Sequence, residues 1–153
     1  MIIPDINLLL YSYDTASPFH DKARAWLEDC LSGTEIVGLP RVVLFGFIRV
    51  ATNSRAFQRP MTAVEAGNQV RSWLSQPITQ VLDSGPLYIR EVLKLLETLG
   101  TAGNLVTDAQ IAVAALDHGA VVHTSDTDFI RFPGLRWYNP ITESGSRSVN
   151  KRK

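Results

Sequence analysis

Short apolar runs alternate along the chain with longer segments in which apolar residues recur every three or four positions. The short runs, which favour β-strands, lie at residues 1–4, 35–39, 78–82, 120–124 and 135–139. The segments with helical spacing lie between them, at residues 6–14, 17–33, 41–52, 62–76, 86–100 and 107–119. Strands that alternate with helices are typical of α/β domains with a parallel sheet. The pattern therefore predicts a three-layer α/β/α sandwich with a mostly parallel central sheet of about four to five strands.

Local signals mark the ends of several expected helices. Ser17 is expected to cap the second helix, which should stop at Gly33. Thr62 is followed three residues later by Glu65, the spacing of a capping box. Thr107 is expected to cap the last helix.

Length and composition predict one folded domain with a short tail. The chain has 153 residues, of which 45% are hydrophobic, and this suits one domain with a sizeable core over residues 1–141. Residues 142–153 are rich in serine and in basic groups, so a disordered basic C-terminal tail is expected there. Its basic residues are Arg147, Lys151, Arg152 and Lys153.

The cysteine content and the apolar runs predict the cellular compartment of the protein. Cys30 is the only cysteine, which excludes an intramolecular disulfide and a thiolate metal site. The apolar N-terminus lacks a basic leading region and reaches Asp5 too early for a signal peptide. No apolar run approaches the roughly 18–20 residues of a membrane span. The chain is therefore expected to be cytoplasmic, with no membrane partner.

Charge is balanced overall but not along the chain. Lysine plus arginine and aspartate plus glutamate each number 15, so the formal net charge is zero. Residues 36–64, however, contain no acid. This acid-free window contains Arg41, Arg49, Arg55 and Arg59. We therefore expect a polyanion to bind at the acid-free window or at the tail, and not over the surface as a whole.

Aspartates follow the expected strands at one edge of the sheet. Asp5 follows the first strand, Asp126 and Asp128 follow the fourth, and Asp108 lies on the first turn of the last helix. In parallel α/β sheets the ligand site lies beyond the carboxyl ends of the strands. Each aspartate also has a structural interpretation, as a helix cap or a turn residue. Their common edge favours a shared site.

Carboxylates gathered without basic partners repel one another unless a cation neutralises them. Mg²⁺ and Mn²⁺ prefer oxygen ligands, and Mg²⁺ often needs only one or two protein carboxylates in addition to a substrate phosphate. These residues therefore favour a metal-dependent phosphodiesterase.

Three segments resemble a known family. The stretches "PDINLLLY", "TAGNLVTDAQIAVAALDHGA" and "SDTDFIRFPGLRWYNP" are similar to the VapC branch of the PIN-domain ribonucleases, the toxins of type II toxin–antitoxin modules. The likeness covers about residues 1–141. It implies a PIN-like α/β/α fold and an endoribonuclease that uses Mg²⁺, or Mn²⁺ as a substitute, to cut structured RNA such as tRNA or rRNA and so inhibit translation. It also implies a homodimer that is inhibited by a cognate VapB-type antitoxin in a heterotetramer or larger complex.

The resemblance also assigns residues. Asp5, Asp108 and Asp126 match the family's catalytic, metal-binding aspartates, and Asp128 is held in reserve as a further ligand. Three neighbours are expected to orient the carboxylates or a water, although they also suit helix and turn caps: Asn7, Thr107 and Ser125. The arginines of the acid-free window are the candidate RNA contacts, and exposed surface arginines are the alternative.

The chain departs from the family pattern in the helix after the second strand. Many PIN nucleases have a glutamate there, and the corresponding position in this chain falls near Leu44. No acid within residues 36–64 replaces it, so a single-ion site is preferred over a two-ion site. Asp128 gains importance for the same reason.

Two other functions remain open at this point. The missing glutamate also suits a catalytically weak PIN fold that serves as an RNA- or antitoxin-binding module. A phosphoryl-accepting domain is disfavoured because Asn7 stands where a phosphatase of the haloacid type has its second aspartate. The apolar helices at 6–14 and 41–52 suit an antitoxin groove, a dimer seam or a plain core.

Overall fold

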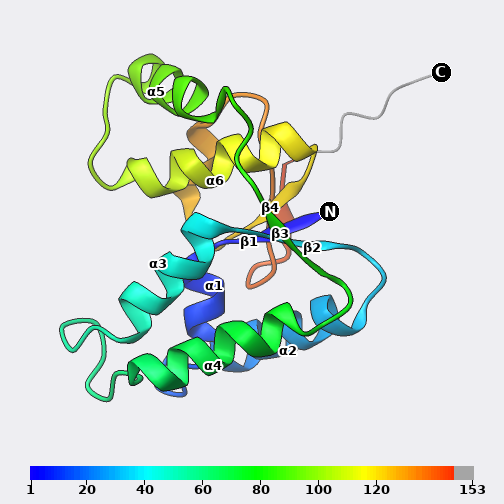
Figure 1. The fold of residues 1–153 in the computed structure, drawn as a ribbon, viewed down its shortest axis with the longest axis vertical. Coiled ribbons are helices and arrows are strands. Elements are labelled where there is room, and N and C mark those ends of the chain that lie inside the picture. Colours follow the sequence, from blue (N-terminus) through cyan, green and yellow to red (C-terminus); the bar gives the residue numbers. More distant parts are fainter. Residues whose placement is uncertain (147–153) are drawn as a thin grey trace.

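The computed structural model describes residues 1–146 and contains one mixed sheet with helices on both sides (Figure 1). Its strands are β1 (Ile2–Pro4), β2 (Val37–Pro40), β3 (Thr79–Leu82), β4 (Val121–His123), β5 (Arg136–Asn139) and β6 (Ser144–Gly145). Its α-helices are α1 (Ile6–Tyr11), α2 (His20–Ser32), α3 (Arg41–Ala51), α4 (Ala63–Leu74), α5 (Tyr88–Leu99) and α6 (Leu105–His118). A 3₁₀ helix, η1, spans Thr127–Arg131.

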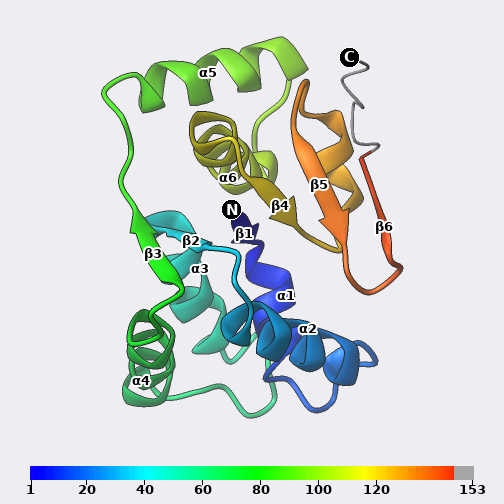
Figure 2. The same cartoon turned by 90° about the vertical axis from the view of Figure 1, so that its right-hand side faces the viewer.

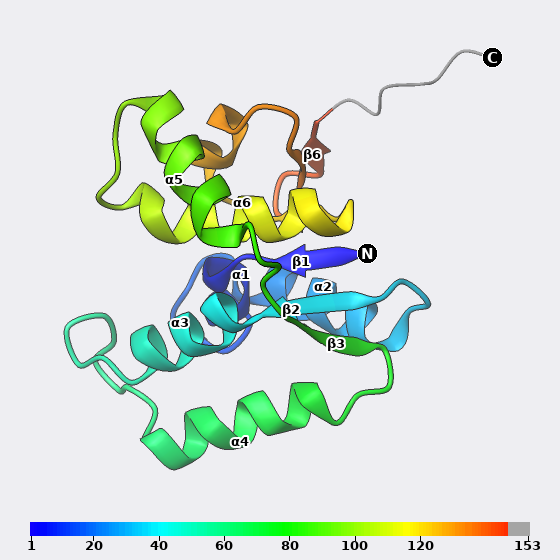
Figure 3. The ribbon, with the colours of Figure 1, turned by 45° about the horizontal axis from the view of Figure 1, so that its top comes forward.

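The sheet has the strand order β3-β2-β1-β4-β5-β6. The first five strands pair in parallel, and β6 pairs with β5 in the antiparallel sense. In Figure 3, α5 and α6 lie on one side of the sheet and α2 and α4 on the other. The chain changes side after β3, because the connection to β4 crosses back over β1. The predicted α/β/α class and the mostly parallel sheet are confirmed.

The sheet has one strand more than the upper limit of the prediction. The extra strand, β6, has two residues, which is too short for an alternation of apolar and polar positions to mark it. Its backbone pairs Gly145 with Tyr138 and Ser144 with Asn139 at the edge of the sheet away from β3 (Figure 2). The regular structure therefore continues past residue 141, into the segment where we expected the tail. The rest of that segment, residues 147–153, lies outside the described residues.

The predicted stop of α2 at Gly33 and the predicted cap of α4 are confirmed. At α4 the capping box is present: Glu65 N–H donates to Thr62 Oγ1 at 3.1 Å, and Thr62 N–H donates to Glu65 Oε2 at 2.7 Å. The prediction of a Ser17 cap on α2 was wrong by two residues, because Ser17 Oγ accepts from Phe19 N–H in a turn before the helix.

The start of α6 differs from the prediction too. The helix begins at Leu105 with Asn104 as its N-cap, so Thr107 lies inside the helix and is not its cap. A turn through Gly103, at φ 56°, precedes the helix, and the N-cap lies three residues before the predicted one. As a result Asp108 is the fourth residue of α6.

The core holds the first strand and helix rigidly in place. Ile3 and Leu8 are fully buried on β1 and α1. α1 packs on α3 so closely that a β-carbon at Gly46 would collide with the Cδ1 atom of Ile6. This packing fixes Asp5, which lies between β1 and α1.

Within residues 1–146, no helix combines the length and the apolar character that crossing a membrane requires.

Candidate active site

Asp5 stands where β1 ends and α1 begins. Its backbone N–H donates to the carbonyl oxygen of His123 at 2.8 Å, which extends the pairing of β1 with β4 by one residue. The side chain is only 3% exposed. A carboxylate this deeply buried needs a hydrogen-bond partner or a cation.

Thr124 supplies that partner and joins two strand ends. Its Oγ1 donates to Asp5 Oδ2 at 2.8 Å and accepts from the backbone N–H of Asp126 at 2.9 Å. The side chain is 1% exposed, so water does not compete for these bonds. Sequence reasoning selected the neighbouring Ser125 and missed Thr124. One sequence signal could have identified Thr124. It lies two residues before Asp126, and at that spacing a hydroxyl can accept a hydrogen bond from the backbone N–H of the aspartate.

Three other aspartates form a cluster at the same edge of the sheet. Asp108 on α6, Asp126 after β4 and Asp128 on η1 can place one carboxylate oxygen each within 4.8 Å of one another. Asp126 also caps η1, because its Oδ1 accepts from Asp128 N–H at 2.8 Å. Asp128 lies 3.6 Å from Arg131, which is the one cation paired with this cluster within residues 1–146.

The pKa values reflect this crowding. Burial raises the pKa of Asp5 from 3.8 to about 6, and the charge of Asp126 adds to the rise. The Thr124 hydroxyl and the amides of Ile6 and Asn7 act against it, although Asp5 makes no capping hydrogen bond to α1. Burial also raises the pKa of Asp108 to about 7, with further contributions from the charges of the other three aspartates.

The donor set suits a hard divalent cation. All candidate ligands are carboxylate oxygens, and Mg²⁺ and Mn²⁺ prefer such ligands. Burial is the main cause of the raised pKa of Asp108, and the charges of the other three aspartates add to it, so a cation bound among them would favour the ionised form. Asp128, which we held in reserve, belongs to the three-residue group, whereas Asp5 lies outside it and interacts with the cluster through its charge.

The three expected orienting residues do not hold the acids in this structure. Asn7, Thr107 and Ser125 are half-buried. Within residues 1–146 none of their side chains forms a hydrogen bond to an aspartate of the site. Thr107 instead lines a neighbouring cavity.

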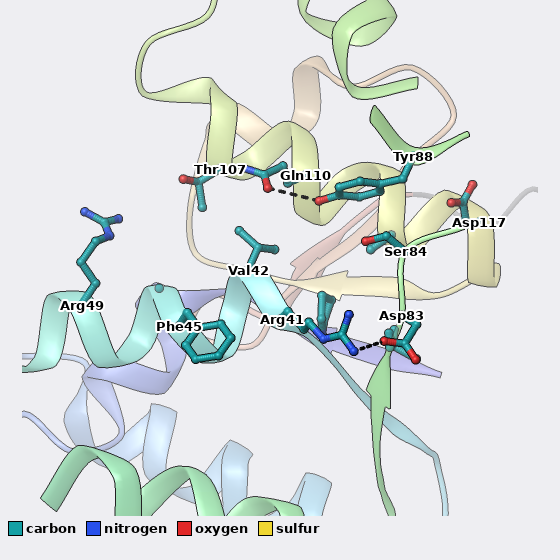
Figure 4. A pocket seen from close by; sticks show the side chains of 14 residues that line it. Arg41, Val42, Phe45, Arg49, Asp83, Ser84, Tyr88, Thr107, Gln110 and Asp117 are labelled. Atoms are coloured by element: carbon teal, nitrogen blue, oxygen red, sulfur yellow. Dashed lines mark hydrogen bonds and ion pairs between the residues drawn. The ribbon is translucent and has the colours of Figure 1, made fainter. Parts of the chain in front are cut away.

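The four arginines of the acid-free window do not form one patch. Arg41 forms an ion pair with Asp83 at 2.5 Å and lines a cavity together with Arg49 (Figure 4). Arg59 borders a different pocket beside Tyr13, and Arg55 lies exposed in the segment after α3. A run of arginines in sequence was therefore a weak guide to their position in space.

The helix that follows β2 provides no carboxylate. Leu44 is 6% exposed and belongs to the hydrophobic core, so the position expected for a glutamate is filled by an apolar side chain.

His123 supports the site from the sheet. Trp26 Nε1 on α2 donates to His123 Nδ1 at 2.9 Å, and burial lowers the pKa of His123 to about 4. The neutral ring and the indole thus fix the end of β4, from which Thr124 and Asp126 follow.

Comparison with known proteins places this site in a family context. The model of the PIN domain matches residues 2–135. Ribonuclease VapC33 of Mycobacterium tuberculosis is 46% identical over 143 residues, which cover 94% of this chain and 100% of that protein. Ribonuclease VapC37 of the same species is 38% identical over 92% of this chain and 97% of its own length.

Solved structures share the fold. VapC20 of M. tuberculosis, described as a toxin that cleaves the sarcin–ricin loop, matches with a TM-score of 0.67 at 14% identity and covers 85% of this chain and 93% of its own. VapBC2 of Rickettsia felis, solved with a DNA fragment from its promoter, matches with a TM-score of 0.64 at 21% identity over 91% and 98% of the two chains.

Proposed function

Because the chain belongs to the PIN-domain family, within its group of VapC ribonucleases, we propose that it is a metal-dependent endoribonuclease that acts as the toxin of a toxin–antitoxin module. The observation that carries the proposal is the cluster of Asp108, Asp126 and Asp128, together with Asp5, at the carboxyl edge of β1 and β4. Carboxylates from distant segments with raised pKa values suit a cation that binds a phosphodiester.

Asp108, Asp126 and Asp128 would hold Mg²⁺ or Mn²⁺. The buried Asp5 would add negative charge to the site. The bound ion would supply Lewis acidity toward a phosphodiester and toward water. Asp108 has a pKa of about 7 and would therefore release its proton as a cation enters. Thr124 keeps Asp5 Oδ2 engaged, so that the other oxygen of this carboxylate is the one left for the site.

A single ion suits this cluster better than two. The buried Leu44 leaves α3 without a carboxylate, so the acids of the cluster come from α6, from the residue before η1 and from η1. Mg²⁺ tolerates a largely hydrated shell, and three carboxylates are enough for one ion. The same gap also suits the second candidate function, a catalytically weak PIN fold that binds RNA or antitoxin.

The substrate would be structured RNA, such as tRNA or rRNA, and its cleavage would inhibit translation in the cytoplasm. Arg49, Arg55 and Arg59 are the available phosphate contacts of the four candidates, because each is exposed and forms no ion pair within residues 1–146, whereas Arg41 pairs with Asp83. Phosphate contacts of this kind give affinity that falls steeply with salt.

The partners would be a cognate VapB-type antitoxin and a second copy of the chain, in a heterotetramer or larger complex. This proposal is supported by the VapBC complexes of R. felis and of nontypeable Haemophilus influenzae, which share the fold.

The direct test uses purified, antitoxin-free protein with tRNA and rRNA in Mg²⁺, Mn²⁺ or EDTA. Asp108→Asn is expected to reduce cleavage at least about 100-fold, beyond the 10–100-fold typical of residues that only orient ligands. Asp29→Asn, an exposed aspartate on α2, is the matched control. RNA left intact by the parent protein in both metals would favour the binding module instead.

Mapping of RNA 5′ ends after expression, with an Asp5→Asn control, would identify the cleavage sites.

A further inference from the structure

Arg131 is the one positively charged side chain that pairs with the aspartate cluster in the part of the chain that the structure describes, and the proposed nuclease chemistry gives it no role. Its Nη1 atom lies 3.6 Å from Asp128 Oδ1, and the two side chains are 45% and 47% exposed. That separation exceeds the roughly 2.7–2.9 Å of a charge-assisted hydrogen bond. Charge attraction alone therefore holds the guanidinium beside Asp128, and its N–H groups remain available to another acceptor.

The backbone around Arg131 is firmly anchored. Phe129 is fully buried and Phe132 is 2% exposed, and their rings pack edge to face with centroids 5.7 Å apart. At the start of η1, Asp126 accepts a hydrogen bond from the backbone N–H of Asp128. These contacts lie on both sides of the exposed Arg131. Its side chain can therefore change partner while its backbone stays in place.

Asp128 connects Arg131 to the cluster. Its carboxylate belongs to the group with Asp108 and Asp126, whose oxygens lie within 4.8 Å of one another. The same carboxylate is the partner of Arg131. A phosphodiester bound at the cluster would therefore lie within reach of the guanidinium. A divalent cation that takes Asp128 as a ligand would compete with Arg131, because both are attracted to the same negative charge.

We propose that Arg131 binds the phosphodiester that the nuclease cuts, and that Asp128 exchanges Arg131 for the cation when the site is loaded. The released guanidinium donates two hydrogen bonds to the non-bridging oxygens of the phosphate. Arginine suits this role because its planar fork matches a phosphate and stays protonated. Arg131 forms no covalent bond and gives up no proton. The inference rests on the proposed function and adds a substrate-binding residue to it.

The surroundings of Arg131 favour this role over a structural one. An ion pair between half-exposed groups contributes little to stability, because water and salt screen it. A phosphate, in contrast, has a strong need for positive charge at this site. The three carboxylates of the cluster and the buried Asp5 would repel it, and a guanidinium at the rim would offset part of that repulsion.

The phosphate contact is tested through the salt dependence of tRNA binding. The measurement uses the Asp108→Asn background in excess Mg²⁺, so that the RNA stays intact. Adding Arg131→Gln is expected to lower the slope of log affinity against log salt by about 0.7–0.9, the value for one phosphate contact. Arg24→Gln is the matched control and should leave the slope unchanged, because Arg24 is also an exposed arginine in a local ion pair, 2.9 Å from Glu28 on α2.

The exchange at Asp128 is tested by calorimetry with Mg²⁺ and without RNA. Arg131→Gln removes the competitor for this carboxylate, so the variant is expected to bind Mg²⁺ at least about threefold more tightly than the parent protein. Arg131→Lys keeps the positive charge and should stay close to the parent protein. A residue that only stabilised η1 would not tighten metal binding when it is removed.

Cleavage assays provide the third measurement. Arg131→Gln is expected to lower kcat/KM for RNA about 100-fold, as for the loss of one donor to a developing negative charge. Arg131→Lys should recover only part of this loss, because lysine lacks the planar fork. Thermal unfolding checks that each variant keeps the fold, as expected for an exposed position.

Unchanged or faster cleavage by Arg131→Gln would overturn the proposal, and faster cleavage would mean that Arg131 only blocks the cluster. An unchanged salt slope would exclude the phosphate contact, and weaker Mg²⁺ binding would exclude the exchange at Asp128. The proposed function fails in a different way. A parent protein that binds tRNA in Mg²⁺ without cutting it would exclude the nuclease, whereas a lower salt slope in Arg131→Gln would still assign this residue to RNA binding.

Discussion

Thr124 donates a hydrogen bond of 2.8 Å to Asp5 across 119 positions of sequence, and both side chains are almost completely buried. This bond connects the ends of β1 and β4, the two central strands that bring the acids together. The arrangement of the site therefore depends on a residue that carries no charge.

We expect Thr124→Val to damage both stability and activity. Valine has nearly the same shape but leaves Asp5 Oδ2 and the Asp126 N–H without their partner, which costs roughly 1–3 kcal/mol of unfolding free energy. RNA cleavage is expected to fall about 10–100-fold, because the acids lose their orientation. Urea denaturation and cleavage assays measure the two effects. Thr98→Val, which removes an exposed hydroxyl on α5, serves as the control and should change neither.

Asp5→Asn is expected to change the pH dependence of stability in metal-free protein. The folded state holds a proton on Asp5 up to about pH 6, whereas the unfolded chain releases it near 3.8, so this group makes stability fall as pH rises between those values. The asparagine variant lacks that loss and should exceed the parent protein at pH 8 by no more than about 3 kcal/mol. The advantage should disappear below about pH 4.

His123 acts in the opposite direction, because its lowered pKa makes stability fall as pH drops from about 6.5 to about 4. It is present in both proteins and cancels in the difference between them, which retains the titration of Asp5 and the part of the Asp108 pKa rise that the Asp5 charge causes. Denaturation curves from pH 4 to pH 8 in EDTA provide the measurement. A difference that stays constant over this range would show that Asp5 does not titrate as described.

Asp128→Asn is expected to weaken Mg²⁺ binding about as much as Asp126→Asn does. Both carboxylates belong to the three-residue cluster, so each variant removes one possible ligand. Calorimetry of the parent protein should give one Mg²⁺ per chain, with each variant at least about tenfold weaker. Asp29→Asn controls for the loss of one negative charge elsewhere. Unchanged affinity in Asp128→Asn would remove this residue from the site.

Trp26→Phe is expected to loosen the end of β4. The substitution keeps most of the packing but removes the N–H that donates to His123 Nδ1, at a cost of about 1–2 kcal/mol. The change should also shift the NMR signals of the His123 ring, which would lose its acceptor role. Phe19→Leu, a change of an exposed aromatic residue just before α2, offers a comparison that leaves this bond intact. An unaltered His123 spectrum in Trp26→Phe would contradict the contact.

The sequence by itself determined the features that depend on neighbours along the chain. Apolar spacing located the six helices and five of the six strands, because burial imposes a period of 3.6 on helices and alternation on strands. The Thr62–Glu65 capping box was predictable because both of its hydrogen bonds span three residues. The common edge of Asp5, Asp108 and Asp126 also followed from sequence, since parallel strands place their carboxyl ends together.

Only the tertiary structure decided the contacts between distant segments. Thr124, and not Ser125, supports Asp5 because the paired strands β1 and β4 bring the Thr124 hydroxyl to that carboxylate. Arg41 and Arg59 share an acid-free stretch of sequence, yet α3 and the segment after it carry them to different pockets. Distances across the sheet and between helix faces depend on packing, and local sequence pattern does not encode them.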